Sequence, residues 1–287
     1  SDEVVGMWVC TYVPWMDADM AVNVYQADGK AFFTGFVGNV DFDYAANVKT
    51  TYTVIGDLMF QSNPMSYEGA PEYLAFRMDY SPNGSEHGDV LTNTNIMVFG
   101  DEVIETTASM IRIRQTLDLP GMKYDYMKTF VTNVKGEDKD IPFLNTSFNF
   151  AKMDGSIIDK FLKSILFTVE FPEANKIKYS YLLEGKNIVI DAPIEVDGNK
   201  MTIKMSANNP AYQDVDMYAF QDQDNTQMHW YMPTTSFEKF FGNTSVALML
   251  GYGQLDKDDT EGIANVYKTI ADAVESINLS LVMTKAK

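Results

Sequence analysis

The chain has little of the chemistry on which most enzymes and metal proteins depend. One residue of 287 is a cysteine, Cys10, so no internal disulfide can form, and we expect this side chain to be a small buried apolar group. The two histidines are His87 and His229, and no cysteine or histidine spacing fits a zinc site. Gly-x-Ser-x-Gly elbows and glycine-rich phosphate loops are also missing. The sequence therefore predicts a protein that is not an enzyme and has no cofactor and no metal.

Positive charge is also scarce. The chain carries 22 Lys and Arg against 40 Asp and Glu, which gives a net charge of −18. Such a chain is repelled by phosphate backbones and by anionic lipid surfaces, so nucleic acid is excluded as a partner. No apolar run reaches the ~18 residues of a membrane helix, which leaves a lipid anchor as the expected route to a membrane. Hydrophobic residues make up 46% of the chain, enough to form a core.

Many short β-rich segments separated by turn signals predict a mainly β protein. Asp28-Gly29 and Asp197-Gly198 are typical hairpin turns, and long βαβ repeats are missing. Two segments share the pattern Tyr-x-aliphatic-x-Gly, at Tyr52–Phe60 and Tyr181–Ile190, which suggests a duplicated β unit. The charged stretch Lys135–Asp140 favours a domain boundary, so we expect one domain over 1–138 and a second over 139–287.

Helical patterns are confined to the second half. Ser156–Leu166 has one apolar face and predicts a short helix inserted in the second domain. An aromatic turn is expected to end at Gly242, with a short apolar segment after it over Thr244–Leu250. The clearest helix is expected from Asp258 to about Ile277, opened by a capping box, and a last strand should then close the sheet edge.

These features resemble the calycin group of lipocalin-like barrels. The resemblance is carried by Gly6-Met7-Trp8, by the two Tyr-x-aliphatic-x-Gly hairpins, and by the late helix followed by Leu279–Thr284. More narrowly, the chain is similar to tandem lipocalin-like lipoproteins of Bacteroidetes. Phe148, where that pattern has Trp, and the helix over Ser156–Leu166 depart from it. The family implies two antiparallel β-barrel or barrel-like units with a few helices, the longest near the C-terminus, and it supplies no catalytic residues.

The first residues bear on location. Ser1-Asp2-Glu3 is similar to the acidic segment that follows the lipidated cysteine of lipoproteins in that phylum. The resemblance implies an exported protein of the cell envelope, at the outer membrane, on its surface or in the periplasm. An arbitrary starting point for the sequence is the alternative.

Two arginines are the first candidate ligand residues. Arg112 and Arg114 alternate with isoleucines, so in a strand they share one face. If that face lined a barrel, the pair could clamp a carboxylate or a phosphate. On an outer face the two side chains would instead pair with nearby carboxylates in solvent.

Aromatic residues are the second candidates. Trp15, His229, Trp230 and Tyr231 could stack on sugar rings or steroid-like ligands, or could pack in the core. Phe237 and Phe241 could belong to a lid over a barrel mouth, or to a helical cap that plugs a core.

Carboxylates occur in pairs at Asp17/Asp19, Asp41/Asp43, Asp214/Asp216 and Asp222/Asp224. A glycosidase would use two carboxylates at ~5–10 Å, one of them with a raised pKa. Because Asp is mostly exposed in proteins, we expect these pairs to be solvated loop residues instead. We therefore expect a non-catalytic cell-envelope protein that binds a small apolar or glycan ligand. A structural or assembly protein with side-chain-filled barrels is the alternative, and a hydrolase is the third hypothesis.

Overall fold

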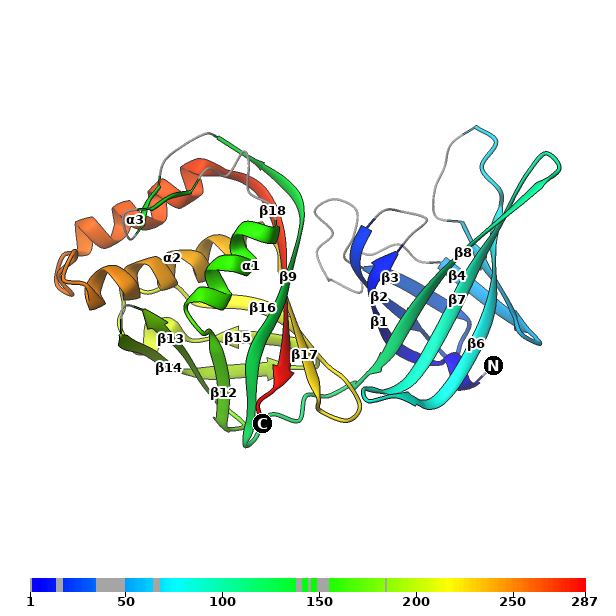
Figure 1. Ribbon diagram of the computed structural model, residues 1–287, viewed down its shortest axis with the longest axis horizontal. Coiled ribbons are helices and arrows are strands. Elements are labelled where there is room, and N and C mark those ends of the chain that lie inside the picture. Colours follow the sequence, from blue (N-terminus) through cyan, green and yellow to red (C-terminus); the bar gives the residue numbers. More distant parts are fainter. Residues whose placement is uncertain are drawn as a thin grey trace. The chain divides into compact units, whose positions relative to one another are not determined.

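The computed structural model describes residues 2–13, 18–34, 50–63, 68–137, 141–143, 146–148, 155–183 and 185–287. The chain forms two compact units (Figure 1). The first comprises Ser1–Gln115 together with Gln221–Thr226, and the second comprises Thr116–Phe220 and Gln227–Lys287.

The first unit is a closed barrel in which each strand pairs with the next and β1 pairs with β8. All its neighbouring strands are antiparallel, and a short 3-10 helix, η1, spans Asp2–Val4 before the first strand. Its strands are β1 Gly6–Val13, β2 Ala18–Tyr25, β3 Lys30–Thr34, β4 Thr50–Ile55, β5 Leu58–Ser62, β6 Tyr73–Ser85, β7 Gly88–Phe99 and β8 Glu102–Ile113.

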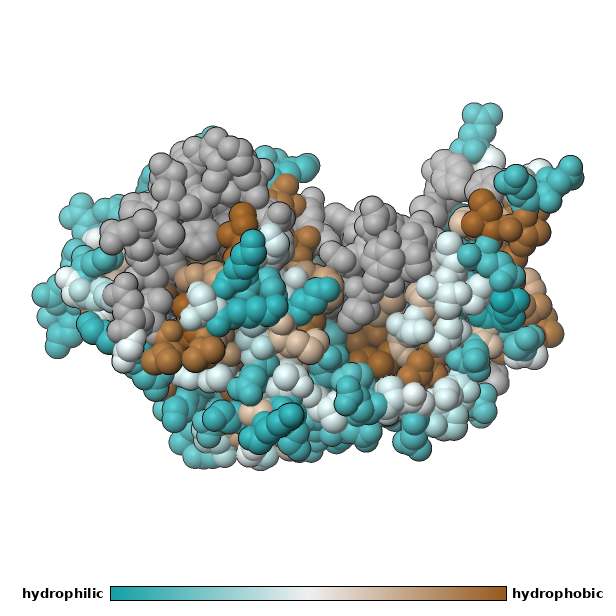
Figure 2. Space-filling view, viewed as in Figure 1, coloured by the Kyte–Doolittle hydropathy of each residue, from teal (hydrophilic) through white to brown (hydrophobic). Residues whose placement is uncertain are grey.

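Strands β7 and β8 form the longest hairpin of this barrel. Ten residue pairs join them, from Val90 and Ile111 to Phe99 and Glu102, whereas four pairs join β8 to β1. The hairpin therefore extends beyond the end of its pairing with β1. Val98 and Val103, near the tip, are 66% and 62% exposed, and Figure 2 shows hydrophobic residues gathered over this end.

The second unit is also a closed antiparallel barrel, completed by β18 pairing with β9. A separate two-stranded sheet is formed by β10 Ile141–Phe143 and β11 Thr146–Phe148. The barrel strands are β9 Met122–Gly136, β12 Thr168–Glu173, β13 Lys176–Leu183, β14 Lys186–Asp197, β15 Lys200–Ile203, β16 Val215–Gln221, β17 Gln227–Met232 and β18 Val274–Lys285. The prediction of a mainly β protein with two antiparallel barrels is confirmed.

The division between the units falls earlier in the chain than the sequence predicts. Strand β9 pairs with both β12 and β18, so it closes the second barrel. The contacts divide the chain after Gln115, and not after residue 138. The charged stretch at Lys135–Asp140 misled the prediction because it begins inside β9 and leads to β10, still within the second unit.

The two similar hairpins occupy different places in their barrels. Tyr52–Phe60 joins β4 to β5, the fourth and fifth strands of the first barrel, whereas Tyr181–Ile190 joins β13 to β14, the third and fourth of the second. Their turns differ as well. Gly56 directly follows paired Ile55, whereas Gly185 directly precedes paired Lys186. The shared pattern therefore does not mark equivalent strands or equivalent turns.

The described residues of the second unit form three α-helices: α1 Gly155–Ser164, α2 Thr234–Gly251 and α3 Thr260–Ala273. The inserted helix is thus confirmed as α1. The aromatic turn and the apolar segment after it are one helix, α2, which is the longest of the three and continues through Gly242. The expected last helix is shorter than predicted, because Val274 and Ile277 already lie in β18. Its N-cap is Asp259, whose Oδ1 accepts a hydrogen bond from the Gly262 N–H at 2.8 Å.

Candidate ligand site in the first barrel

The interior of the second barrel is packed with aromatic and aliphatic side chains. Phe167 lies at the centre of an aromatic cluster, with its ring centroid 5.3 Å from that of Tyr181 and 6.3 Å from that of Trp230. Helix α2 contributes to the same cluster, because the Phe240 ring centroid lies 6.4 Å from that of Phe167. Such ring pairs fill space and add to the stability of a core. The second barrel is therefore filled, at least over the side chains that the structure describes.

The first barrel differs because amide side chains occupy its interior. Side chains alternate along a strand, and Asn93 lies directly opposite Ala108 and Met78, which belong to or pack against the apolar core of this barrel. Four amides share this inward face, and they are at most 8% exposed. They are Asn23 on β2, Gln61 on β5, and Asn93 and Asn95 on β7.

Each of these four amides has a buried carbonyl oxygen with no hydrogen-bond partner among the described residues. Three of them use their NH2 groups within the barrel. Asn23 Nδ2 donates to Met110 Sδ at 2.8 Å, and Gln61 Nε2 donates to Thr50 Oγ1 at 2.9 Å. Asn93 Nδ2 lies 3.4 Å from the Tyr25 hydroxyl oxygen, across the barrel. The site therefore presents hydrogen-bond acceptors to its interior.

Tyr25 adds a donor to this acceptor-rich site. Its ring centroid lies 5.2 Å from that of Tyr52, in an edge-to-face arrangement. Burial raises the pKa of Tyr25 well above its ordinary range, an effect that the Asn93 hydrogen bond only partly offsets. The phenol thus stays protonated at neutral pH, and its proton is available to an acceptor.

A pocket of about 630 Å³ lies where β1 begins, at Gly6, and where β2 ends, at Tyr25. It is lined by Val5, Gly6, Met7, Val24, Tyr25, Gln26, Ala27, Asp28 and Gln115. This pocket is open to solvent, and none of the four amides lines it. Tyr25 lines this pocket and also contacts the amide cluster through Asn93.

Arg112 has a structural role at this end of the barrel. Its guanidinium carbon lies 4.2 Å from the centroid of the Trp8 ring, and Nε lies 3.1 Å from Asp89 Oδ2. The Nη1 and Nη2 groups donate to the backbone carbonyls of Val5 and Glu3, at 2.7 and 2.5 Å. Nε, Nη1 and Nη2 of Arg112 each bond to the protein itself, so this residue has structural partners on all three nitrogens and is not a solvated outer residue.

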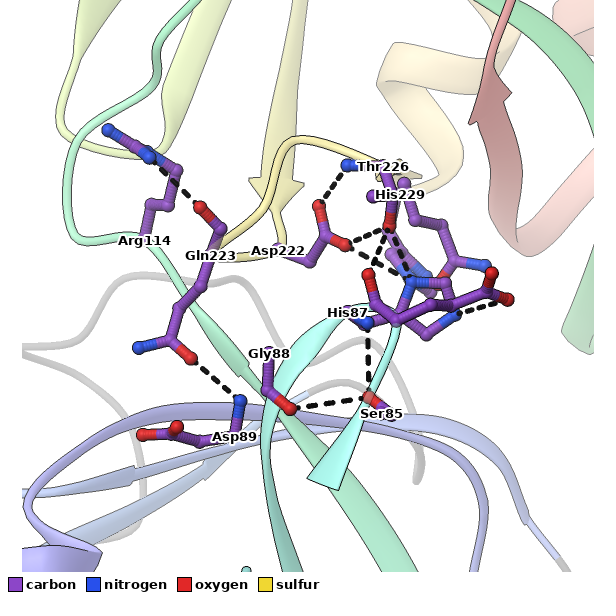
Figure 3. A network of polar contacts seen from close by, with 11 residues as sticks. Ser85, His87, Gly88, Asp89, Arg114, Asp222, Gln223, Thr226 and His229 are labelled. Atoms are coloured by element: carbon purple, nitrogen blue, oxygen red, sulfur yellow. Dashed lines mark hydrogen bonds and ion pairs between the residues drawn. The ribbon is translucent and has the colours of Figure 1, made fainter. Parts of the chain in front are cut away.

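Arg114 follows β8 instead of continuing it, and its Nη1 donates to the Gln223 carbonyl at 3.1 Å. The two arginines therefore do not form one clamp. Gln223 belongs to the first unit, as do Ser85, His87, Gly88 and Asp89 at the β6–β7 turn, which Figure 3 shows. In this network of polar contacts, the Asp89 N–H donates to Gln223 Oε1 at 2.8 Å.

The same network contains His87, Asp222 and Thr226 but does not form a catalytic triad (Figure 3). His87 Nδ1 lies 3.1 Å from Asp222 Oδ2 and 2.7 Å from Thr226 Oγ1. In a triad, the carboxylate and the hydroxyl contact opposite nitrogens of the imidazole. Here both contact the same nitrogen, and the Thr226 hydroxyl also donates to Asp222.

The remaining predicted ligand residues lie elsewhere. His229, Trp230 and Tyr231 are consecutive in β17 and at most 2% exposed, so they do not form an external stacking surface. Phe237 is buried in the core of the second unit, and its ring stacks on that of Phe241 at 5.5 Å. These two aromatics therefore belong to the cap that plugs a core. Trp15 lies outside the described residues.

The carboxylate pairs also have local roles where their side chains are described. Asp214 Oδ1 accepts from the Ser206 hydroxyl at 2.7 Å, and Asp216 Oδ1 accepts from Thr202 at 2.6 Å. Asp222 is fully buried, contrary to the expectation of a solvated loop residue. Asp17, Asp41 and Asp43, and the side chain of Asp19, lie outside the described part of the structure.

Sequence reasoning missed the amide cluster, although one signal was present. Asn93 and Asn95 alternate in the segment Thr92-Asn-Thr-Asn-Ile96, which places them on one face of a strand. Deciding that this face is the interior requires the register with Met78 and Ala108, which pairs residues far apart in sequence.

The described residues contain no group of three or more His, Cys, Asp or Glu side chains arranged to hold a metal ion. No described helix combines the length and the apolar character needed to cross a bilayer. The chain matches no family model, no curated protein and no solved structure.

Proposed function

We propose that this protein is a non-catalytic binding protein of the cell envelope whose first barrel holds a small ligand. One observation carries the proposal: four buried amide oxygens in one barrel interior without a partner among the described residues. Leaving a buried acceptor unpaired costs about 1–3 kcal/mol. A ligand donor that reached these oxygens would remove that cost. The barrel interior would have to open for this, because each oxygen has less than 1 Å² of accessible surface. Ordered water is the competing explanation.

The second barrel supports a different role in the same molecule. Its interior is filled by rings such as Phe167, Trp230 and Phe240, which leave the described core apolar and closely packed. We assign it a structural or assembly role, acting through its outer surface. The two functions that the sequence predicts as alternatives are thus divided between the two barrels in this proposal.

Location in the cell envelope is part of the same proposal, and its support is the resemblance of the chain to tandem lipocalin-like lipoproteins. A lipid anchor would hold such a protein at the outer membrane. The test is fractionation of cells that produce the natural precursor. We expect the protein in the membrane fraction, released as a soluble protein when the anchoring cysteine is replaced.

The binding function is tested by thermal unfolding with palmitate, cholate and a set of neutral sugars. A ligand at a hundredfold excess over its Kd stabilises the folded state by about 2.7 kcal/mol. We expect such a shift from one class of compound. It should be lost when Asn93 and Asn95 are both replaced by leucine. If no compound shifts the transition, the binding function is wrong.

A further inference from the structure

One side of β8 has no partner strand over most of its length, as far as the structure describes the chain. On the side away from β7, the described pairing with β1 begins only at Met110, so the stretch from Glu102 to Ser109 has no strand beside it. This stretch is eight residues long, more than the roughly 5–6 residues of a typical strand. Unpaired N–H and C=O groups along such an edge form a template onto which a further strand can add.

The other edge of the same hairpin is shorter. Strand β6 pairs with β7 as far as Asn95, which leaves only the four residues from Ile96 to Phe99 without a described neighbour on that side. A strand added there would form about half as many backbone hydrogen bonds as one added to β8. The edge of β8 is therefore the stronger of the two sites.

Aliphatic side chains are exposed on both faces of this hairpin. Val98 and Val103 form a cross-strand pair on one face, and Ile104, on the opposite face, is exposed as well (Figure 2). A partner that lay flat against the hairpin would cover one face only. A strand added at the edge places side chains beside both faces, so strand addition accounts for this exposure better than flat docking does.

The first unit carries most of the negative charge of the chain. Its residues include 18 Asp and Glu against 5 Lys and Arg, a net charge of −13, compared with −18 for the whole chain. On the hairpin, Asp101 and Glu102 are exposed, and Glu105 is paired with Arg77 at 2.9 Å. A positively charged segment is attracted to this surface, whereas a second copy of the chain would bring the same negative charge to it.

We propose that the free edge of β8, from Glu102 to Ser109, is a docking site for an extended, positively charged segment of a partner protein, which adds to the first barrel as a further strand. Main-chain hydrogen bonds supply the affinity of such an addition, and side chains of the added strand supply its specificity. Basic side chains next to Asp101 and Glu102 favour the pairing, because opposite charges on neighbouring strands attract. This surface does not involve the amides inside the barrel, so the proposal stands or falls independently of the small-ligand function.

The experiment titrates a fluorescently labelled peptide, Lys-Val-Thr-Val-Lys-Val-Thr-Val-Lys, with the full chain and follows fluorescence anisotropy. The control peptide has glutamate in place of each lysine, so it keeps the apolar pattern and reverses the charge. We expect the basic peptide to bind at least about tenfold more tightly than the acidic one at low salt. The difference should shrink when the salt concentration is raised to about 0.5 M, because salt screens exposed charges.

Thr107 lies within this edge, and Thr107→Pro tests the backbone directly. The turn of the hairpin has two residues, Gly100 and Asp101, so the flanking pair Phe99 and Glu102 is hydrogen-bonded and every second pair after it is too. By this alternation the Thr107 N–H points away from β7, so proline removes it without loss of a bond to β7. Binding of the basic peptide should weaken at least about tenfold, which corresponds to about 1.4 kcal/mol.

Thr107→Val is the matched control. Both variants lose the side-chain hydrogen bond to Thr94, whose hydroxyl oxygen lies 3.0 Å from that of Thr107, but valine keeps the backbone N–H. Thr107→Val should bind the basic peptide as the unaltered protein does. If near-ultraviolet circular dichroism shows that Thr107→Pro does not fold, Asp101→Lys combined with Glu102→Lys is the second test, and it should also weaken binding of the basic peptide.

The outcomes separate the site from its occupant. Binding of the basic peptide that Thr107→Pro weakens and Thr107→Val preserves supports the proposal. Equal binding of the two peptides overturns the charge of the partner, and binding that survives both Thr107→Pro and the lysine variant overturns the site. If neither peptide binds, the proposal is wrong as a whole. If sedimentation equilibrium shows dimers of the unaltered chain that Thr107→Pro separates, the occupant is a second copy, and the proposed partner is wrong.

Discussion

Arg112 shows how one side chain can look like a ligand group in the sequence and serve the fold instead. Its position on the inward face places it over the Trp8 ring, beside Asp89 and the carbonyls near η1. The alternation with Ile111 and Ile113 correctly indicates a strand. Its partners come from residues about 20 and 100 positions earlier in the chain, so local pattern could not reveal them.

The titration of the Asp89 carboxyl makes the free energy of unfolding depend on pH. Burial alone would raise the pKa of this carboxyl, but the Asn83 N–H, the Tyr80 hydroxyl and the Arg112 guanidinium together hold it below its usual range. A carboxyl with a lowered pKa contributes stability that is present above its unfolded pKa of about 3.9 and is lost as pH falls through the folded value.

Asp89→Asn should therefore lower the free energy of unfolding by roughly 1.5–3 kcal/mol at pH 7, the range for hydrogen bonds to charged groups. The difference from the unaltered protein should shrink as pH falls from 5 to 3. Urea unfolding at each pH measures it, with Asp79→Asn at an exposed position of β6 as the control. A difference that stays constant down to pH 3 contradicts this account.

At the scale of elements, α2 illustrates why a glycine was misread as a helix end. Gly242 lies inside the helix because a Cβ atom there would collide with the ring of Tyr267 on α3. The glycine allows the two helices to approach closely. The sequence correctly indicated helical spacing around Phe237 and Phe240, but only the packing of α3 explains the glycine.

Gly242→Ala should destabilise the second unit, although alanine favours helix by about 1 kcal/mol over glycine. The collision with Tyr267 outweighs that gain, because an aromatic ring cannot move as a flexible chain end does. Gly251→Ala is the matched control in the same helix. Its Cβ would meet Ile188 Cδ1, the far end of a flexible side chain, so we expect little change. Chemical denaturation compares the two variants, and equal effects would show that Tyr267 is not the cause.

At the scale of the whole molecule, the chain has two apolar cores that share no residue. One contains Trp8, Cys10 and Met110, and the other contains Phe167 and Trp230. The fold class could be predicted from turn signals and strand periodicity. The boundary could not, because the assignment of β9 to the second barrel depends on its pairing with β18, more than a hundred residues later.

The separate cores lead to a calorimetric prediction. Differential scanning calorimetry should resolve two unfolding transitions, and a ligand of the first barrel should raise the temperature of one of them. Trp8→Phe should alter the transition that the ligand shifts, whereas Trp230→Phe should alter the other. A single transition that the ligand shifts as a whole would mean that the two units unfold together.

Strand β8 pairs with β7 over most of its length and with β1 over only a short part of it. Its pairing with β7 runs along ten residues, but its pairing with β1 runs from Met110 to Ile113 only. Between Glu102 and Ser109, the described pairing of β8 is with β7 alone, so alternate peptide groups there point away from β7. Thr106, whose buried hydroxyl has no partner among the described residues, lies in this part of β8. A strand edge of this kind can accept a further strand.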